Sequence, residues 1–151
     1  LNQSKTYFTP INIDTRDEFN LLFKRLVDVT SLTSKTIKTK SRSLLIESCS
    51  ANVALCDFDL LCANNLGHED YKNIAKTFSL IFIENIPQFN NDNTDQCRRF
   101  ISLIDMLYEQ QCSVVLLAEN PISSICEVQS LRKEFDRTAS RLYEMTIIKP
   151  S

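Results

Sequence analysis

The stretch Leu80-Ile81-Phe82-Ile83-Glu84 decides the fold, together with Ser113-Val114-Val115-Leu116-Leu117-Ala118 further along the chain. Both runs are short and apolar at successive positions, which is typical of parallel strands that are buried on both faces. Between them lie an asparagine-rich loop, a helix cap at Asn93 or Thr94, and a helical pattern that extends to about Gln111. A strand, a helix and a second strand in this order predict a right-handed parallel βαβ unit.

A first helix is expected near the beginning of the chain. Thr15 and Glu18 form a capping-box pattern, and apolar residues then recur at helical spacing up to about Thr30. The following segment, 31–41, is rich in serine, threonine and lysine, and we expect a surface loop or an irregular strand there.

The segments 43–49 and 53–58 predict a β-hairpin, in whose short polar turn Asn52 can adopt the left-handed conformation. A second helix should begin close to Gly67, and a last helix should cover about 127–145. The predicted class is therefore α/β, or α+β because the hairpin precedes the parallel unit. In either case a β-hairpin is followed by a parallel βαβ unit with flanking helices.

Length and charge limit the possible functions. The 151 residues suffice for a single domain or a partial one, because a chain of this length can bury about 70% of its unfolded surface. The formal net charge of −2 lacks the basic excess of nucleic-acid-binding domains, so no nucleic acid is expected as a partner. No apolar run approaches the roughly 20 residues of a membrane span, so no transmembrane segment is expected.

The cysteines do not show the spacing of a metal site. Six cysteines, at positions 49, 56, 62, 97, 112 and 126, include no Cys-x-x-Cys pair. The single histidine, His68, lies at an expected helix start, where we predict that it faces solvent. We therefore expect buried, reduced thiols and no bound metal.

The last predicted helix carries Glu134, Arg137, Arg141 and Glu144 along one face. One interpretation is an exposed stripe of weak ion pairs. The other starts from Arg137 and Arg141, which lie one turn apart and repel each other. Two adjacent guanidinium groups usually indicate an anionic partner beyond the local glutamates.

The helix before it places Arg98 and Asp105 two turns apart on one face. Asp105 is flanked by apolar residues, so we expect it at the edge of the buried face, paired with Arg137 or Arg141. Arg98, Asp105, Glu134 and Glu144 are thus candidates for structural ion pairs, whereas Arg99 is expected to face solvent.

Two further carboxylates, Glu84 and Glu119, end the predicted parallel strands, and an asparagine follows each. Ligands of α/β sheets bind at the carboxyl ends of parallel strands. A magnesium site would also require bound phosphates, and no phosphate-binding loop accompanies these residues. Capping of the strand ends is the favoured role.

Two runs carry a family resemblance, the segment 98–109 and the segment 134–145. The latter reads Glu-Phe-x-Arg-Thr-x-Ser-Arg-Leu-x-Glu-Met, and further shared residues appear in the same order. These are Leu61-Cys62, Leu66-Gly67, Asp70-Tyr71, Ile86-Pro87, Glu119 and Pro121. In these residues the chain resembles the C-terminal portion of the ZapE family of AAA+ P-loop ATPases, the bacterial cell-division ATPase and its mitochondrial relatives.

The resemblance implies a P-loop ATPase-type fold and a parent protein that uses ATP and Mg²⁺ to remodel protein clients. It also implies an upstream ATPase core as a partner, a possible homo-oligomer, and a location in the bacterial cytoplasm or the mitochondrial matrix. Arg137 and Arg141 are the residues that it marks as candidate nucleotide-sensing arginines, because AAA+ ATPases use arginines of this region to stabilise charge on the γ-phosphate.

One motif of that family is absent. The phosphate-binding loop Gly-x-x-x-x-Gly-Lys-Ser/Thr needs two glycines, whereas this chain has Gly67 alone. The resemblance places this loop and the Asp-Glu strand earlier in the family's sequence. Because the chain begins with leucine, we expect a piece of a longer protein that does not itself hydrolyse ATP. The alternative hypothesis is a non-catalytic α/β module that binds an acidic partner surface through its paired arginines.

Overall fold

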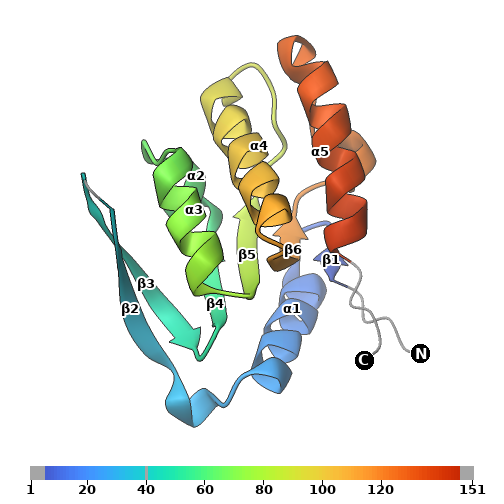
Figure 1. The fold of residues 1–151 in the computed structure, drawn as a ribbon. Helices are drawn as coiled ribbons and strands as arrows, with labels where there is room; N and C mark the ends of the chain where they lie inside the picture. The colour runs from blue at the N-terminus through green and yellow to red at the C-terminus, as the bar shows by residue number, and fades with distance from the viewer. Residues whose placement is uncertain (1–5, 40, 147–151) are drawn as a thin grey trace.

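The computed structural model describes residues 6–39 and 41–146 and forms one six-stranded sheet with helices on both faces (Figure 1). The strands are β1 (Tyr7–Phe8), β2 (Thr33–Lys38), β3 (Ser43–Ser50), β4 (Val53–Asp57), β5 (Leu80–Ile86) and β6 (Ser113–Ala118). The helices are α1 (Ile13–Leu26), α2 (Phe58–Cys62), α3 (His68–Thr77), α4 (Thr94–Glu109) and α5 (Arg132–Met145).

The sheet has a parallel half and an antiparallel half. Its strand order is β1-β6-β5-β4-β3-β2, in which β1, β6, β5 and β4 run parallel, while β3 and β2 are antiparallel to their neighbours. The β3–β4 hairpin and the β5–α4–β6 unit confirm the predicted α/β class and are consistent with the C-terminal part of a P-loop ATPase-type fold.

Alternation along β5 explains why helices cover both faces of the sheet. Ile81 and Ile83 point into the large core under α2, α3, α4 and α5, whereas Phe82 points to the opposite face against α1. The same alternation continues in β6, where Val115 and Leu117 belong to the α1 side. A strand that is apolar on both faces needs two covering layers, as parallel strands generally do.

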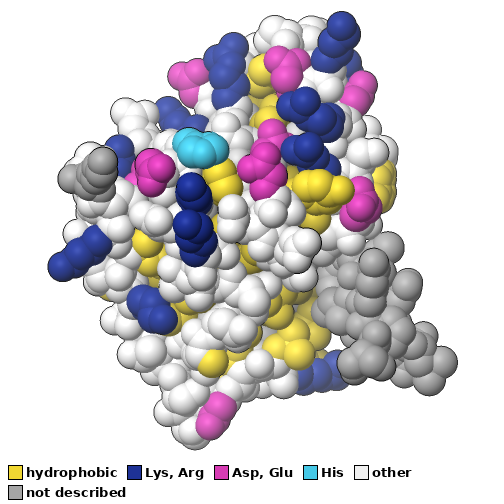
Figure 2. Space-filling view, viewed as in Figure 1, with side chains coloured by type: hydrophobic (Ala, Val, Ile, Leu, Met, Phe, Trp, Pro, Cys, Tyr) yellow, Lys and Arg dark blue, Asp and Glu magenta, His cyan; other side chains and the backbone are white. Residues whose placement is uncertain are grey.

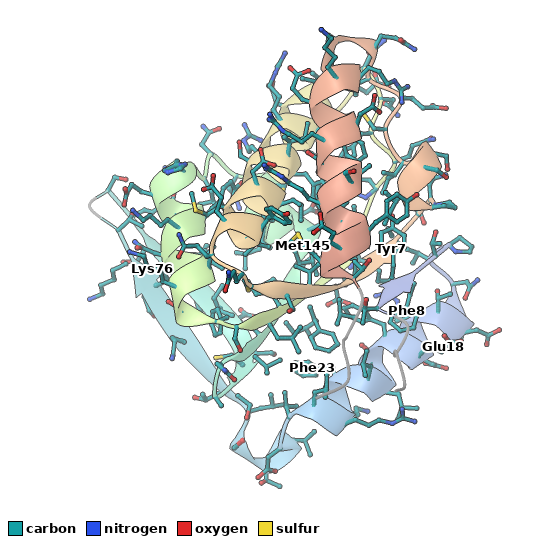
Figure 3. All side chains as sticks on the ribbon, turned by 45° about the vertical axis from the view of Figure 1, so that its right-hand side comes forward. Tyr7, Phe8, Glu18, Phe23, Lys76 and Met145 are labelled. Carbon is teal, nitrogen blue, oxygen red and sulfur yellow. The ribbon has the colours of Figure 1, made fainter. Side chains whose placement is uncertain are left out.

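The smaller core is built mainly from aromatic rings. The Phe82 ring lies 5.4 Å from that of Phe19 and 5.1 Å from that of Phe23, both in edge-on geometry. Phe8 of β1 also belongs to this layer, and Figure 3 shows Phe8 and Phe23 on the opposite side of the sheet from Met145 at the end of α5. Such edge-on aromatic pairs contribute beyond their buried area, so they fix the position of α1.

Helix α1 does not cover the whole of its face. On β3, Leu44 and Ile46 point into the large core, so Leu45 points to the α1 side, where it is 48% exposed. The antiparallel half of the sheet is therefore open on this side. None of the helices in the described ranges has the length and hydropathy that a membrane span requires.

The predicted limits of α1 are wrong at both ends. Its N-cap is Asn12, whose side chain accepts a hydrogen bond from the Thr15 N–H at 2.9 Å, while the Thr15 hydroxyl accepts from the Asn12 N–H at 3.0 Å. This reciprocal pair satisfies two free N–H groups one turn before the predicted Thr15–Glu18 box. The helix ends at Leu26, because Val27 is extended, and a 3-10 turn at Val29–Ser31 precedes β2.

Two other local predictions are wrong. The positive φ of the hairpin turn, 52°, belongs to Ala51 and not to Asn52. Helix α5 begins at Arg132 and not near residue 127, since a 3-10 turn at Gln129–Leu131 precedes it. For the segment 31–41, the structure confirms the alternative of an irregular strand, because β2 pairs with β3 and the register shifts between Thr33 and Lys35.

Replacing Phe82 by alanine should lower the free energy of unfolding by about 3–5 kcal/mol, because the buried ring and its contacts with α1 are lost. Urea unfolding followed by circular dichroism measures this change. Leu45→Ala, on the exposed part of the same face, should change stability by less than about 0.5 kcal/mol. Equal effects of the two substitutions would contradict the role given to Phe82.

Candidate functional site

Helices α4 and α5 lie side by side on one face of the sheet, and their facing surfaces bring the predicted charged residues together (Figure 1). The inner face of α5 is formed by Phe135, Thr138 and Leu142, which are buried at helical spacing. This spacing turns Arg137 and Arg141 toward the edge of the interface. Asp105 of α4 lies at the same edge and contacts both arginines.

The three charged side chains make contacts of unequal strength. Arg141 Nη1 donates a hydrogen bond to Asp105 Oδ1 at 2.6 Å, whereas Arg137 Nη2 lies 3.9 Å from Asp105 Oδ2. The Arg141 guanidinium also stacks on the Tyr108 ring, 4.8 Å from its centroid. The side chains of Asp105 and Arg141 are about one-quarter exposed, at 26% and 25%, but that of Arg137 is 60% exposed.

This difference separates the roles of the two arginines. Arg141 is held by a short charge-assisted hydrogen bond and by an aromatic face, so it links α4 to α5. Arg137 has one long contact with the same carboxylate and presents most of its guanidinium to solvent. Of the two, Arg137 is better placed to bind an external anion.

The other predicted ion-pair residues lie at different places. Glu144 accepts a hydrogen bond from the Tyr108 hydroxyl at 3.3 Å, which places it beside the cluster. Arg98 pairs with Asp95, one turn earlier on α4, at 3.3 Å, and both side chains are largely exposed. Glu134 is exposed on the first turn of α5. The structure thus brings Asp105, Arg137 and Arg141 into contact, with Glu144 beside them.

The prediction for Arg99 was wrong. Instead of facing solvent, its guanidinium donates to the Cys62 carbonyl at 2.9 Å and to Asn65 Oδ1 at 2.8 Å. These bonds connect α4 to the last residue of α2 and to the loop that follows it. No local pattern indicates them, because both partners precede Arg99 by more than thirty residues.

A second polar network lies at the carboxyl ends of β4 and β5, on the α1 side. Arg16 of α1 donates to Glu84 Oε1 at 3.0 Å and to Asn85 Oδ1 at 2.6 Å. Asn85 in turn donates to Asp57 Oδ1 at 2.7 Å. Asn85 has a φ of 64° at a break in the β5–β6 register, and this backbone bend directs its amide toward both partners.

This network carries a perturbed carboxylate. Burial raises the pKa of Glu84 above its usual value, Arg16 opposes the shift, and Asp57 adds to it. Sequence reasoning identified Glu84 and Asn85 as residues at a strand end but missed Arg16. The network ties α1 to the end of the parallel sheet, which is consistent with a capping role.

The cysteines lie in the core as free thiols. All six are buried, and the Sγ atoms of Cys97 and Cys126 are 3.9 Å apart. Burial raises the pKa of Cys56 and of Cys112 to about 12, so both remain protonated at neutral pH. Within residues 6–39 and 41–146, no three His, Cys, Asp or Glu side chains gather in a possible metal site.

The start of α3, at the single glycine of the chain, is not open to a phosphate. Gly67 caps α3 with an extended backbone, and its N–H donates to the Asp70 carboxylate at 2.8 Å. A carboxylate therefore occupies the position that a phosphate would take at this helix start. His68, the next residue, is exposed.

A double-mutant cycle tests the division of roles at the α4–α5 interface. We expect a coupling energy of roughly 0.5–1.5 kcal/mol between Asp105→Ala and Arg141→Ala, because the pair is close and partly buried. The cycle with Arg137→Ala should give less than about 0.5 kcal/mol, since that contact is long and exposed. Urea unfolding of the four variants in each cycle measures both, and equal couplings would contradict the assignment.

The raised pKa of Glu84 predicts a pH-dependent stability. The folded chain holds this proton more tightly than the unfolded chain does. The contribution of Glu84 is thus largest below its ordinary pKa, and it decreases as pH rises through the raised value. In urea unfolding from about pH 4 to about pH 8, Glu84→Gln should remove this part of the decrease. Glu47→Gln, at an exposed site on β3, should leave the profile unchanged.

Comparisons with known proteins agree with this architecture. The model of the AFG1-like ATPase family matches residues 1–149. Lactation elevated protein 1 homolog B of Danio rerio is 30% identical over 145 residues, which cover 93% of this chain and 28% of that protein. Cell division protein ZapE of Escherichia coli K12 is 28% identical over 145 residues, which cover 96% of this chain and 39% of that protein.

A protein of Schizosaccharomyces pombe without an assigned function is 28% identical over 89 residues, which cover 59% of this chain. No solved structure matches the chain. The chain spans less than two-fifths of the length of the zebrafish and E. coli relatives. Because the family match extends over nearly all of its residues, the chain belongs to the AFG1-like ATPase family.

Proposed function

We propose that this chain is the C-terminal region of a ZapE-like AAA+ ATPase that couples ATP binding and hydrolysis to the remodelling of protein partners. Membership of the AFG1-like ATPase family supports the ATPase part of the proposal. The name of the relative in E. coli, a cell division protein, supports a role in cell division. In a eukaryote, the proposed role is mitochondrial protein quality control. Such a protein would act in the bacterial cytoplasm or, in a eukaryote, in the mitochondrial matrix.

In this proposal the chain does not hold ATP or Mg²⁺ itself. It contains no phosphate-binding loop, and a carboxylate already occupies the start of α3 at Gly67. Nucleotide and metal would be bound by an ATPase core elsewhere in the protein. The described region would pack against that core and contact further copies of the protein or its clients.

The main support for a role in nucleotide hydrolysis is that Arg137 is exposed, whereas Arg141 beside it is paired with Asp105. Asp105 offsets most of the charge of Arg141 through a 2.6 Å contact, and Arg137 keeps a guanidinium that is 60% exposed. A guanidinium held in this way can contact a phosphate that another part of the assembly presents. Arg141 would serve as a positioning residue, since it fixes α5 against α4.

Measurement of ATP hydrolysis by the complete ATPase tests this role. Arg137→Ala should lower kcat at least tenfold and change nucleotide affinity little, as expected for a group that acts mainly in the transition state. Arg132→Ala is the matched control, because Arg132 is exposed on the first turn of the same helix. Loss of kcat in both variants, or in neither, would remove Arg137 from the mechanism.

Arg141→Ala should behave differently, with a lower free energy of unfolding as its main effect. Arg141→Lys should restore part of the lost stability, because it keeps the charge beside Asp105, and turnover of the folded fraction should stay unchanged in both variants. A full loss of kcat in a stable Arg141→Ala variant would instead make Arg141 the arginine that contacts nucleotide.

A non-catalytic interaction module is the second candidate function. The same exposed guanidinium of Arg137 favours it, because an acidic peptide offers a carboxylate closer than Asp105, which lies 3.9 Å from Arg137. The two functions predict different effects of Arg137→Ala, on ATP hydrolysis in the first and on binding of an acidic partner in the second. Arg137→Ala would weaken binding of an acidic partner in the module, with no change in any ATP hydrolysis.

A further inference from the structure

A groove of about 1040 Å³ lies at the amino-terminal edge of β5 and β6, away from the contact between Asp105 and Arg137. The ends of three helices, α1, α4 and α5, surround it together with the first residues of the two strands. Figure 2 shows hydrophobic side chains exposed on this face between α1 and the helices above it. Of the described residues that line the groove, the proposed function uses Arg141 alone.

The groove has an apolar floor. Leu80 begins β5, Cys112 precedes β6, and Leu26 and Met145 end α1 and α5. Leu26 is 43% exposed, so it offers a large apolar surface to an incoming group. Covering such side chains favours binding, because it removes apolar surface from water.

The charges at the rim are mainly negative. Glu109 at the end of α4 and Glu144 near the end of α5 both line the groove and are exposed. Among the described residues that line it, Arg141 is the only basic one, and its guanidinium is bonded to Asp105 and stacked on Tyr108. An occupant therefore meets two carboxylates whose charge Arg141 does not offset.

We propose that this groove binds a polypeptide segment of a partner protein in which an apolar side chain stands next to a lysine or arginine. The apolar side chain would cover the floor, and the cation would lie between Glu109 and Glu144. The carboxylates disfavour nucleic acid and acidic peptides, since like charges facing each other weaken binding. This inference deepens the proposed action on protein partners, because it specifies the chemistry of the segment that is recognised.

Two labelled hexapeptides test the proposal in fluorescence anisotropy with the full chain. The first, Ser-Leu-Ile-Lys-Lys-Ser, carries apolar and basic residues, and the second, Ser-Leu-Ile-Glu-Glu-Ser, reverses the charge. The basic peptide should bind at least tenfold more tightly than the acidic one. Equal affinities, or no binding of the basic peptide, would overturn the proposal.

Variants then assign the binding to this groove. The double variant Glu109→Gln with Glu144→Gln should weaken the basic peptide at least fivefold, and Met145→Ser should weaken both peptides. The matched control is Glu134→Gln with Asp136→Asn, which removes two exposed carboxylates of α5 outside the groove. Circular dichroism confirms that each variant is folded, and unchanged affinity in the first double variant contradicts the assignment.

Two further measurements distinguish a partner's segment from the chain's own residues and from the ATPase role. Ile147, Ile148 and Lys149 follow α5 in the sequence and have the same chemistry as the proposed segment. Binding that appears only after removal of residues 147–151 would assign the groove to the chain's own residues and overturn the partner proposal. Arg137→Ala, which tests the ATPase role, should leave peptide affinity unchanged, so the two proposals can fail independently.

Discussion

The burial of both faces of β5 is the constraint on which the rest of the structure depends. Ile81 and Ile83 need one covering layer and Phe82 needs another. The described part of the chain supplies them as α2, α3, α4 and α5 on one side and α1 on the other. Because α1 covers its side only in part, the fold leaves polar residues accessible at the carboxyl ends of β4 and β5. The Arg16 network forms there, and it holds α1 in place at the edge of the sheet.

The packing of α4 and α5 on one face of the sheet also determines where their charged side chains lie. The helices pack through apolar side chains, so their charged residues collect at the edge, where Asp105 faces two arginines. One carboxylate cannot neutralise two guanidinium groups, and the shorter contact takes most of its charge. The remaining positive charge lies on Arg137, whose side chain is 60% exposed and open to an external anion. The cluster therefore links two helices and still attracts an anion.

The accuracy of the sequence predictions depended on how local each signal is. The runs at β5 and β6 and the periodicity of α4 and α5 are local patterns, and all four elements form, although α5 begins at Arg132 and not near residue 127. The wrong predictions arose where two nearby residues could both cap a helix, or where the partner of a side chain lies far along the chain. Asn12 caps α1 in place of Thr15, and Arg99 finds its acceptors beyond α2. The approach of Arg137 and Arg141 to Asp105 could be expected because both lie at whole-turn spacing. The bonds of Arg16 could not, since residues 84 and 85 lie far along the chain.

The arginine cluster and the groove share side chains, and the strength of their link can be bounded. Arg141 stacks on Tyr108, whose hydroxyl donates to Glu144 at the rim of the groove. A cation bound by Glu144 would compete with the Tyr108 hydroxyl for the carboxylate, and the hydrogen bond between Tyr108 and Glu144 would break. The hydrogen bond is long, at 3.3–3.4 Å, so its contribution lies at the lower end of the usual range of about 0.5–1.5 kcal/mol. Coupling between two sites cannot exceed the free energy of the interaction that connects them. Through this path, occupation of the groove could change anion affinity at Arg137 by no more than a few-fold, because the effect would also have to pass through Asp105. A larger coupling would require movement of α5 as a whole.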